Sequence, residues 1–193
     1  MSDFSWNEIR RREDGKVLLL YRHERIFDEG LTKDASKALD VGGWGVLAQR
    51  LTEEGIDTTI VDIFEEDQYF PDRVRAMKHV VGDITKKETI SALGGKYSFD
   101  LITCFEMLEH CHDQDTAIWN MYQLLREGGW LAGTVPIPGY SHKADEPGIN
   151  WLNPEQLRAL LFASGFEDIF IEPTGSVHKD GTKTSYYFRA RKL

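Results

Sequence analysis

Residues 38–48, Ala-Leu-Asp-Val-Gly-Gly-Trp-Gly-Val-Leu-Ala, predict the central unit of the fold. A short apolar segment, Lys37–Val41, runs into a glycine-rich turn and then into an amphipathic segment, Val46–Glu54. The glycines of the turn are Gly42, Gly43 and Gly45. Glycine has no Cβ and adopts positive φ readily, so a ligand can approach both the end of the strand and the N-terminus of the helix. The stretch therefore predicts a strand, a nucleotide-type binding turn and a helix.

The rest of the chain continues this pattern of strands and helices. Further strands are predicted at Thr58–Asp62, Lys78–Gly82, Phe99–Cys104, Trp130–Val135, Phe166–Glu172 and Thr184–Arg191. Further helices are predicted at Lys86–Leu93, at Asp115–Arg126 before the pair Gly128-Gly129, and from Pro154 to a stop at Gly165. Seven strands with intervening helices indicate an open α/β sheet, and the last two strands, joined by a glycine-containing turn, indicate an antiparallel edge.

Composition and length restrict the class of protein. A chain of 193 residues with 41% hydrophobic and 28% charged residues fits one globular domain. We expect residues 36–193 to form that domain and residues 1–35 to form a helical N-terminal extension, with a possible capping box at Ser5 and Glu8 and an ambiguous apolar segment at Val17–Tyr21. No apolar run reaches the roughly 18 residues that span a bilayer, and no secretory signal pattern is present, so a cytoplasmic location without a membrane partner is expected.

Charge and cysteine content argue against two further classes of protein. The net charge is −9 and the basic residues are scattered, which disfavours nucleic acid as a partner. The two cysteines, Cys104 and Cys111, have no second pair for zinc, and no metal site is expected. Three aromatic residues at helical spacing, Trp119, Tyr122 and Phe162, are predicted to be core residues rather than pocket residues.

Polar or glycine residues follow each of the first four predicted core strands. In an open α/β sheet a ligand lies across the carboxyl ends of the strands, where the strand order reverses. Asp62 comes about 20 residues after the first glycine, a spacing at which a carboxylate accepts hydrogen bonds from a ribose diol. The remaining candidates are Gly82-Asp83-Ile84 after the third strand and Phe105, Glu106 and Glu109-His110 after the fourth.

With these residues in place, the chain resembles the class I S-adenosylmethionine-dependent methyltransferases, in particular the small-molecule enzymes of the quinone-biosynthesis type. The resemblance covers about residues 36–190 and rests on six motifs in order. They are Ala38–Ala48, Val61-Asp62, Gly82-Asp83-Ile84, Phe99–Asp113, Leu124–Pro136 and Asn153–Phe166. It implies a Rossmann-like seven-stranded mixed sheet with helices on both faces and an antiparallel last strand. It also implies methyl transfer from S-adenosylmethionine to an O, N or C nucleophile on a small-molecule acceptor.

The resemblance also implies roles for individual residues. Asp40 and the glycines would hold the methionine part of the cofactor, Asp62 the ribose hydroxyls and Asp83 the adenine, with Ile84 on its ring. Phe105 and Glu106 would flank the sulfonium, and His110 would lie near the acceptor. The cofactor-binding set implied in this way is Asp40, Gly42, Gly43, Trp44, Gly45, Asp62, Ile63, Gly82, Asp83, Ile84, Phe105 and Glu106.

Several assignments have a competing interpretation. The turn Gly42–Gly45 is one residue shorter than the family's Gly-x-Gly-x-Gly, so either the loop is tightened or Trp44 projects over the pocket. Asp83 could instead be the N-cap of the following helix. Arg25, on an N-terminal helix over the cofactor, could pair with the methionine carboxylate or could be a solvated charge.

General-base catalysis is needed if the acceptor is a hydroxyl or a carbon acid. His110 and, in the long loop before Asn153, His142 are the candidate bases, and Tyr140 could face the acceptor from the same loop.

Two other functions fit part of the pattern. A non-catalytic methyltransferase-like module, acting as a partner subunit or sensor, would keep the fold with the altered glycine loop. A nicotinamide-dependent oxidoreductase would also use glycines and an acid at this spacing, but Gly42-Gly43-Trp44-Gly45 is not a Gly-x-Gly-x-x-Gly match.

Overall fold

A computed structural model describes residues 21–43, 45–64, 77–139, 147–175 and 183–193. Within these ranges one seven-stranded sheet has the order β3-β2-β1-β4-β5-β7-β6. The strands are β1 (Lys37–Val41), β2 (Asp57–Asp62), β3 (Lys78–Val81), β4 (Phe99–Phe105), β5 (Leu125–Pro136), β6 (Glu167–Thr174) and β7 (Ser185–Arg191). The helices are α1 (Tyr21–Asp28), α2 (Val46–Glu53), α3 (Lys87–Ala92), the 3₁₀ helix η1 (Leu108–His110), α4 (Gln114–Leu124) and α5 (Pro154–Ala163).

The sheet is mixed, as predicted. Strands β1 to β5 pair in parallel, whereas β7 pairs antiparallel with both β5 and β6. The chain order reverses between β1 and β4, which are neighbours in the sheet although two strands separate them in sequence. This reversal is the position at which ligands bind in open α/β sheets.

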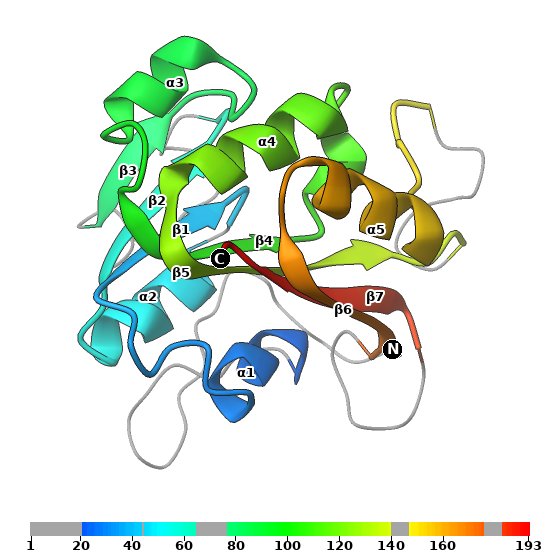
Figure 1. Cartoon of the computed structure of the whole chain (residues 1–193), viewed down its shortest axis with the longest axis horizontal. Helices are drawn as coiled ribbons and strands as arrows, with labels where there is room; N and C mark the ends of the chain where they lie inside the picture. Colours follow the sequence, from blue (N-terminus) through cyan, green and yellow to red (C-terminus); the bar gives the residue numbers. More distant parts are fainter. Residues whose placement is uncertain (1–20, 44, 65–76, 140–146, 176–182) are drawn as a thin grey trace.

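Helices cover both faces of the sheet (Figure 1): α3, α4 and α5 lie over one face, and α1 and α2 over the other. Alternate strand residues supply the two cores, because successive side chains of a strand point to opposite faces. Leu39 and Ile102 pack in the core on the α4 side, and Ala38 and Leu101 pack in the core on the α2 side. The central strands β1 and β4 are therefore buried on both faces.

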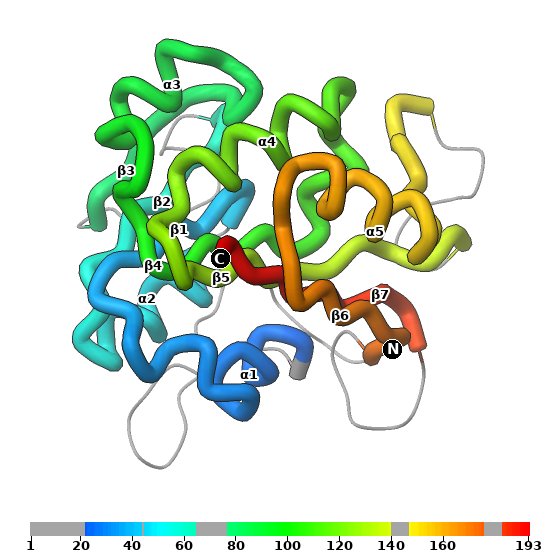
Figure 2. Tube along the Cα trace, viewed as in Figure 1, coloured from blue at the N-terminus to red at the C-terminus, as the bar shows by residue number. Residues whose placement is uncertain are grey.

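The N-terminal helix α1 is packed onto the domain. Its Ile26 is fully buried in the core that α1 shares with α2, and Figure 2 shows both helices on the same side of the sheet. The predicted capping box at Ser5 and the segment 17–20 lie outside the described residues. No helix in the described ranges is both long and apolar enough to cross a membrane.

The predicted end of the helix before Gly128-Gly129 is wrong. Helix α4 ends at Leu124, and the glycines lie within β5, where the pairing jumps from Phe99↔Leu125 to Leu101↔Trp130. Gly128 has a φ of +79°, and a Cβ on Gly129 would come within 3.0 Å of the Asp100 carbonyl oxygen. The glycines are therefore needed for an irregularity inside a strand rather than for a helix stop.

The three aromatic residues predicted to be core residues are not all buried. Trp119 is 48% exposed and Phe162 is 73% exposed, so the prediction is wrong for both. Tyr122 is partly buried and packs against the core through an edge contact with Phe166, at a centroid distance of 5.1 Å. Trp119 stacks on Tyr122 from the outer side, at 5.9 Å.

Candidate functional site

The candidate site lies at the carboxyl ends of β1 to β4, around the reversal of strand order. The glycine turn follows β1, Asp62 ends β2, Gly82-Asp83 follows β3, and Phe105 ends β4 before Glu106. Because these strands are parallel, their carboxyl ends meet at one edge of the sheet. The fold thus brings together the segments that sequence analysis selected.

The glycines of the turn are required by close packing. A Cβ on Gly42 would lie 2.4 Å from Cγ of Met107, and a Cβ on Gly43 would lie 2.0 Å from Oδ2 of Asp40. Gly45, at a φ of +77°, is the N-cap of α2 and makes no side-chain cap. Trp44 lies outside the described residues. The turn therefore presses against the β4–η1 connection on one side and against Asp40 on the other.

Asp40 is a buried carboxylate, and only one of its two oxygens accepts a hydrogen bond from a side chain. Its Oδ1 accepts a 2.8 Å hydrogen bond from the Thr103 hydroxyl, whereas no side chain among the described residues donates to Oδ2, and the backbone N–H of Ala48 lies near the carboxylate. Burial raises the pKa of Asp40 to about 6, and the nearby charge of Asp62 adds to the rise. A buried polar atom without a partner is costly, so Oδ2 is suited to a donor that a ligand brings.

Asp62 ends β2 with a half-buried side chain. Its Oδ1 accepts a 3.0 Å hydrogen bond from the backbone N–H of Phe64. Burial raises its pKa, although the backbone N–H groups of Phe64 and Ile63 oppose the rise. Ile63 is 63% exposed beside it. A carboxylate next to an exposed apolar side chain has the composition expected of a nucleoside subsite.

Asp83 stabilises a turn after β3. Its Oδ1 accepts hydrogen bonds from both the backbone N–H and the hydroxyl of Thr85, each at 2.8 Å. Lys86 is the N-cap of α3, so the alternative interpretation of Asp83 as that N-cap is wrong. Ile84 is 4% exposed and belongs to the main core. Gly82 lies close to α3, because a Cβ there would approach the Thr89 hydroxyl to 2.5 Å.

The turn after β4 is conformationally unusual and is covered by α1. Glu106 has a φ of +53°, a costly value for a side chain with a Cβ, and such strain is concentrated at functional sites. The ring of His23 meets Phe105 edge-on at 4.5 Å, and Nη1 of Arg22 lies 3.9 Å from Oε2 of Glu106. Burial, followed by the charge of Arg22, holds the pKa of His23 well below its usual range. The first turn of α1 therefore places a neutral imidazole and a guanidinium against the site.

Glu109 and His110, in η1, differ in exposure. The His110 side chain is 50% exposed and that of Glu109 is 1% exposed, with 3.8 Å between Nε2 and Oε1. No other residue in the described ranges donates a hydrogen bond to the carboxyl oxygens of Glu109. Burial raises the pKa of Glu109 to about 8, with a further rise from Glu106 and partial decreases from its own backbone N–H and from Arg22. The sequence pattern placed both residues among the candidate contacts after the fourth strand and made His110 the candidate base.

Arg25 lies one turn after Arg22 and has other partners. Its guanidinium binds Glu29 and Glu172 and stacks 3.9 Å from the centroid of the Tyr187 ring. Burial alone would lower its pKa, but the hydrogen bonds and charges of the two carboxylates raise it. Arg25 therefore anchors α1 to β6 and β7, whereas Arg22 faces the turn after β4.

Two predictions remain, one for the loop residues His142 and Tyr140 and one for metal binding. His142 and Tyr140 lie outside the described residues. Among the residues that the structure describes, no three His, Cys, Asp or Glu side chains gather in a way that could hold a metal ion.

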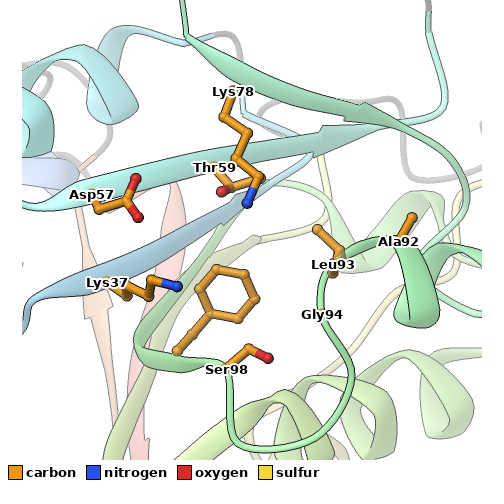
Figure 3. Close-up of a pocket in the computed structure, with 9 residues that line it drawn as sticks. Lys37, Asp57, Thr59, Lys78, Ala92, Leu93, Gly94 and Ser98 are labelled. Carbon is orange, nitrogen blue, oxygen red and sulfur yellow. The ribbon is translucent and has the colours of Figure 1, made fainter.

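A separate concavity lies at the other end of the sheet (Figure 3). Its lining includes the first residues of four strands, Lys37, Asp57, Lys78 and Phe99. The concavity shares no residue with the candidate site.

Comparison with known proteins shows the family. The family profile described as "Methyltransferase domain" matches residues 11–170, which is more than half of the chain. The chain belongs to the methyltransferase domain family. The ubiquinone biosynthesis O-methyltransferase of Photorhabdus laumondii is 34% identical over 96 residues, covering 48% of this chain and 40% of that protein. The enzyme of the same name from Idiomarina loihiensis is 29% identical over 154 residues, covering 70% of this chain and 63% of its own.

A solved structure supports the methyltransferase fold. The 1,6-didemethyltoxoflavin-N1-methyltransferase of Burkholderia thailandensis, solved with bound 1,6-didemethyltoxoflavin and S-adenosylhomocysteine, matches with a TM-score of 0.68. The two are 23% identical, and the match covers 90% of this chain and 77% of that one. The likeness shows the Rossmann-like methyltransferase fold. The chain spans less than two thirds of the length of either curated relative named above.

Proposed function

We propose that this chain is an S-adenosylmethionine-dependent methyltransferase acting on a small molecule. The observation that carries the proposal is the buried carboxylate of Asp40, whose Oδ2 lies against Gly43 of the glycine turn and accepts no hydrogen bond from a side chain among the described residues. It lies at the reversal of strand order, in a chain that belongs to the methyltransferase domain family. When bound, S-adenosylmethionine supplies an electrophilic methyl group on a sulfonium.

The residues at the carboxyl ends fit the parts of this cofactor. Asp40 accepts a hydrogen bond from the methionine ammonium, Asp62 accepts those of the ribose hydroxyls, and Asp83 meets the adenine amino group. The glycines allow the backbone to approach the methionine part. Phe105 and Glu106 border the sulfonium, where an aromatic face and a carboxylate both favour positive charge.

For the methionine carboxylate we assign Arg22 in place of Arg25. Arg22 lies against Glu106, whereas the guanidinium of Arg25 is engaged by Glu29 and Glu172. A guanidinium binds a carboxylate strongly where its position is fixed. Helix α1 thereby becomes part of the site as well as a cover over it.

Oxygen is the methylated atom that the relatives favour, since both curated proteins named above are O-methyltransferases. We therefore propose a hydroxyl-bearing small molecule as the acceptor. The second function that remains is a non-catalytic methyltransferase-like module, which the shortened turn at Gly42–Gly45 favours.

Calorimetric titration with S-adenosylhomocysteine tests the proposal, with NAD as the competing ligand. We expect micromolar binding of S-adenosylhomocysteine, weakened about tenfold or more in Asp62→Ala. Asp57→Ala is the matched control, because Asp57 begins the strand that Asp62 ends and is exposed. Equal effects of the two substitutions, or binding of NAD alone, would contradict the proposal. Binding without methyl transfer to any hydroxyl compound would favour the non-catalytic module.

A further inference from the structure

The concavity at the amino ends of the strands carries side chains that the candidate site does not use. It has a volume of about 260 Å³. Besides the first residues of four strands, its lining includes Thr59, Ser98 and the segment Ala92, Leu93 and Gly94 at the end of α3. Pockets for whole small-molecule ligands have volumes of roughly 300 to 1,000 Å³. The concavity therefore suits a small ligand, or one group of a larger one.

Four polar side chains of the lining come from three neighbouring strands and share one face of the sheet. Lys37 of β1 pairs with Asp57 of β2, and Thr59 of β2 pairs with Lys78 of β3. Residues two apart on a strand point to the same face, so this register places all four on that face. Figure 3 shows the side chains of Lys37 and Lys78 pointing into the concavity from the two strands that flank β2.

The protein does not engage the donors on this face. Neither the Lys37 nor the Lys78 ammonium group forms an ion pair with a residue in the described ranges, and the Thr59 hydroxyl forms no hydrogen bond with one. The Ser98 hydroxyl differs, because it already donates to the Gly95 carbonyl at 2.9 Å. Two cationic donors and one neutral donor are therefore available to a ligand.

The charge of the concavity favours an anion. Among the described lining residues, Asp57 is the only acidic one, against two lysines. Asp57 is exposed, whereas Lys37 is half-buried. Water and salt screen an exposed charge more effectively than a partly buried one. The lining therefore has a net positive charge, although the whole chain has a net charge of −9.

We propose that this concavity binds a phosphate group, either as inorganic phosphate or as part of a small phosphate monoester. The phosphate oxygens accept hydrogen bonds from the Lys37 and Lys78 ammonium groups and from the Thr59 hydroxyl. A phosphate group carries close to two negative charges at pH 8 and so matches two ammonium groups, whereas a carboxylate carries one. Lysine binds phosphate as a point charge, and its flexible stem lets two lysines adjust to one ligand.

Calorimetry and thermal unfolding with sodium phosphate at pH 8 test the proposal, with sodium chloride keeping the ionic strength constant. Lys37→Met and Lys78→Met keep a flexible stem and remove the charge, and Thr59→Val removes the hydroxyl with little change in shape. Lys87→Met is the matched control, because Lys87 is exposed at the start of the helix that ends at the concavity and does not line it.

We expect the wild type to bind phosphate with a dissociation constant of about 1 mM, because exposed ion pairs are weak. Phosphate at about 10 mM should then raise the melting temperature by about 3 to 6 °C. Each lysine variant should lose about tenfold in affinity and most of this rise, and Thr59→Val should lose about fivefold in affinity. Lys87→Met should respond as the wild type does.

Phosphate also stabilises proteins in general, because it is excluded from their surfaces, and this effect is common to all variants. Equal rises in melting temperature for the wild type and both lysine variants would show exclusion alone and would overturn the proposal. Acetate that binds as tightly as phosphate would also overturn it. If Lys37→Met, on a central strand, does not fold, Lys78→Met on the edge strand β3 decides the outcome.

Glycerol 3-phosphate distinguishes the two sources of the phosphate group. Binding at least as tight as that of inorganic phosphate assigns a monoester, whereas binding of inorganic phosphate alone assigns the free ion. Neither result depends on the proposed function, because the concavity and the candidate site share no residue. A wild type that binds no S-adenosylhomocysteine refutes the cofactor assignment only, and one that binds neither phosphate compound refutes the phosphate site only.

Discussion

Asp100, at the amino end of β4, and Asp40, at the carboxyl end of β1, differ in how many hydrogen bonds the chain donates to their carboxylates. At the amino end of β4, Asp100 accepts hydrogen bonds from the backbone N–H and hydroxyl of Ser36 and from the backbone N–H of Lys37, at 2.8 to 2.9 Å. Arg126 adds an ion pair at 3.1 Å. Burial alone would raise the pKa of Asp100, but these partners lower it.

At the carboxyl end of β1, Asp40 has an oxygen that accepts no hydrogen bond from a side chain among the described residues, and burial raises its pKa. A carboxylate whose oxygens accept hydrogen bonds from the chain stabilises the fold. A buried carboxylate oxygen without such a partner lowers the stability of the fold and is available to a ligand. The difference separates a carboxylate that supports the fold from one that is open to a ligand.

Removing the charge of Asp40 should have the largest effect on ligand binding. Asp40→Asn keeps the size of the side chain and removes the charge that faces the methionine ammonium. We expect affinity for S-adenosylhomocysteine to fall about a hundredfold, the order of 2 to 5 kcal/mol that loss of a buried charge partner costs. Calorimetry measures this change, and thermal unfolding should show no loss of stability. If Asp40→Asn is less stable than the wild type but binds S-adenosylhomocysteine equally well, Asp40 serves the fold and not the ligand.

The same substitution at Asp100, at the amino end of β4, should lower the stability of the fold and leave the affinity for the ligand unchanged. Asp100→Asn loses a charged acceptor of three hydrogen bonds and its ion pair with Arg126. We expect the free energy of unfolding to fall by about 2 kcal/mol, as for hydrogen bonds to charged groups. Affinity for S-adenosylhomocysteine should remain that of the wild type. Chemical denaturation gives the first quantity, and a matching drop in affinity would show that the two ends are not independent.

The raised pKa of Asp40 predicts how binding depends on pH. In the proposed site the methionine ammonium pairs with the carboxylate form of Asp40, which is lost as the pH falls through about 6. Below that value affinity for S-adenosylhomocysteine should decrease by about tenfold for each pH unit. Asp40→Asn should bind with little dependence on pH in this range. Titrations at a series of pH values provide the test, and a flat profile for the wild type would argue against contact with Asp40.

The hydroxyl of Thr103 should make a smaller contribution. Thr103→Val removes the donor to Oδ1 of Asp40 with little change in shape. The hydrogen bond favours the carboxylate, so its loss should raise the pKa of Asp40 further and weaken binding at neutral pH by about fivefold, close to the 1 kcal/mol of one hydrogen bond. The pH midpoint of binding should move upward. If the midpoint stays in place, Thr103 does not tune Asp40.

The sequence predicts best the features that depend on local pattern. The strand Lys37–Val41 has the predicted bounds, and the predicted mixed sheet is confirmed. Alternating burial along a strand and backbone freedom at glycine are both properties of neighbouring residues, so the sequence displays them directly.

Features that depend on contacts between residues far apart in the sequence could not be predicted from local pattern. Gly128-Gly129 has the composition of a helix stop, yet the pair serves a close approach to the carbonyl of Asp100. Glu109 resembles any acidic loop residue until packing buries it, and Arg22 and Arg25 differ only in which carboxylates the fold places beside them. Partners and burial are tertiary properties, and the site is defined by them.

One calorimetric series tests the account most directly: S-adenosylhomocysteine titrated into the wild type, Asp40→Asn and Asp100→Asn at neutral pH. We expect the wild type and Asp100→Asn to bind with similar affinity, and Asp40→Asn to lose about a hundredfold in affinity. No binding by the wild type, or equal losses in the two variants, would contradict the claim that the carboxyl end of the sheet is the cofactor site.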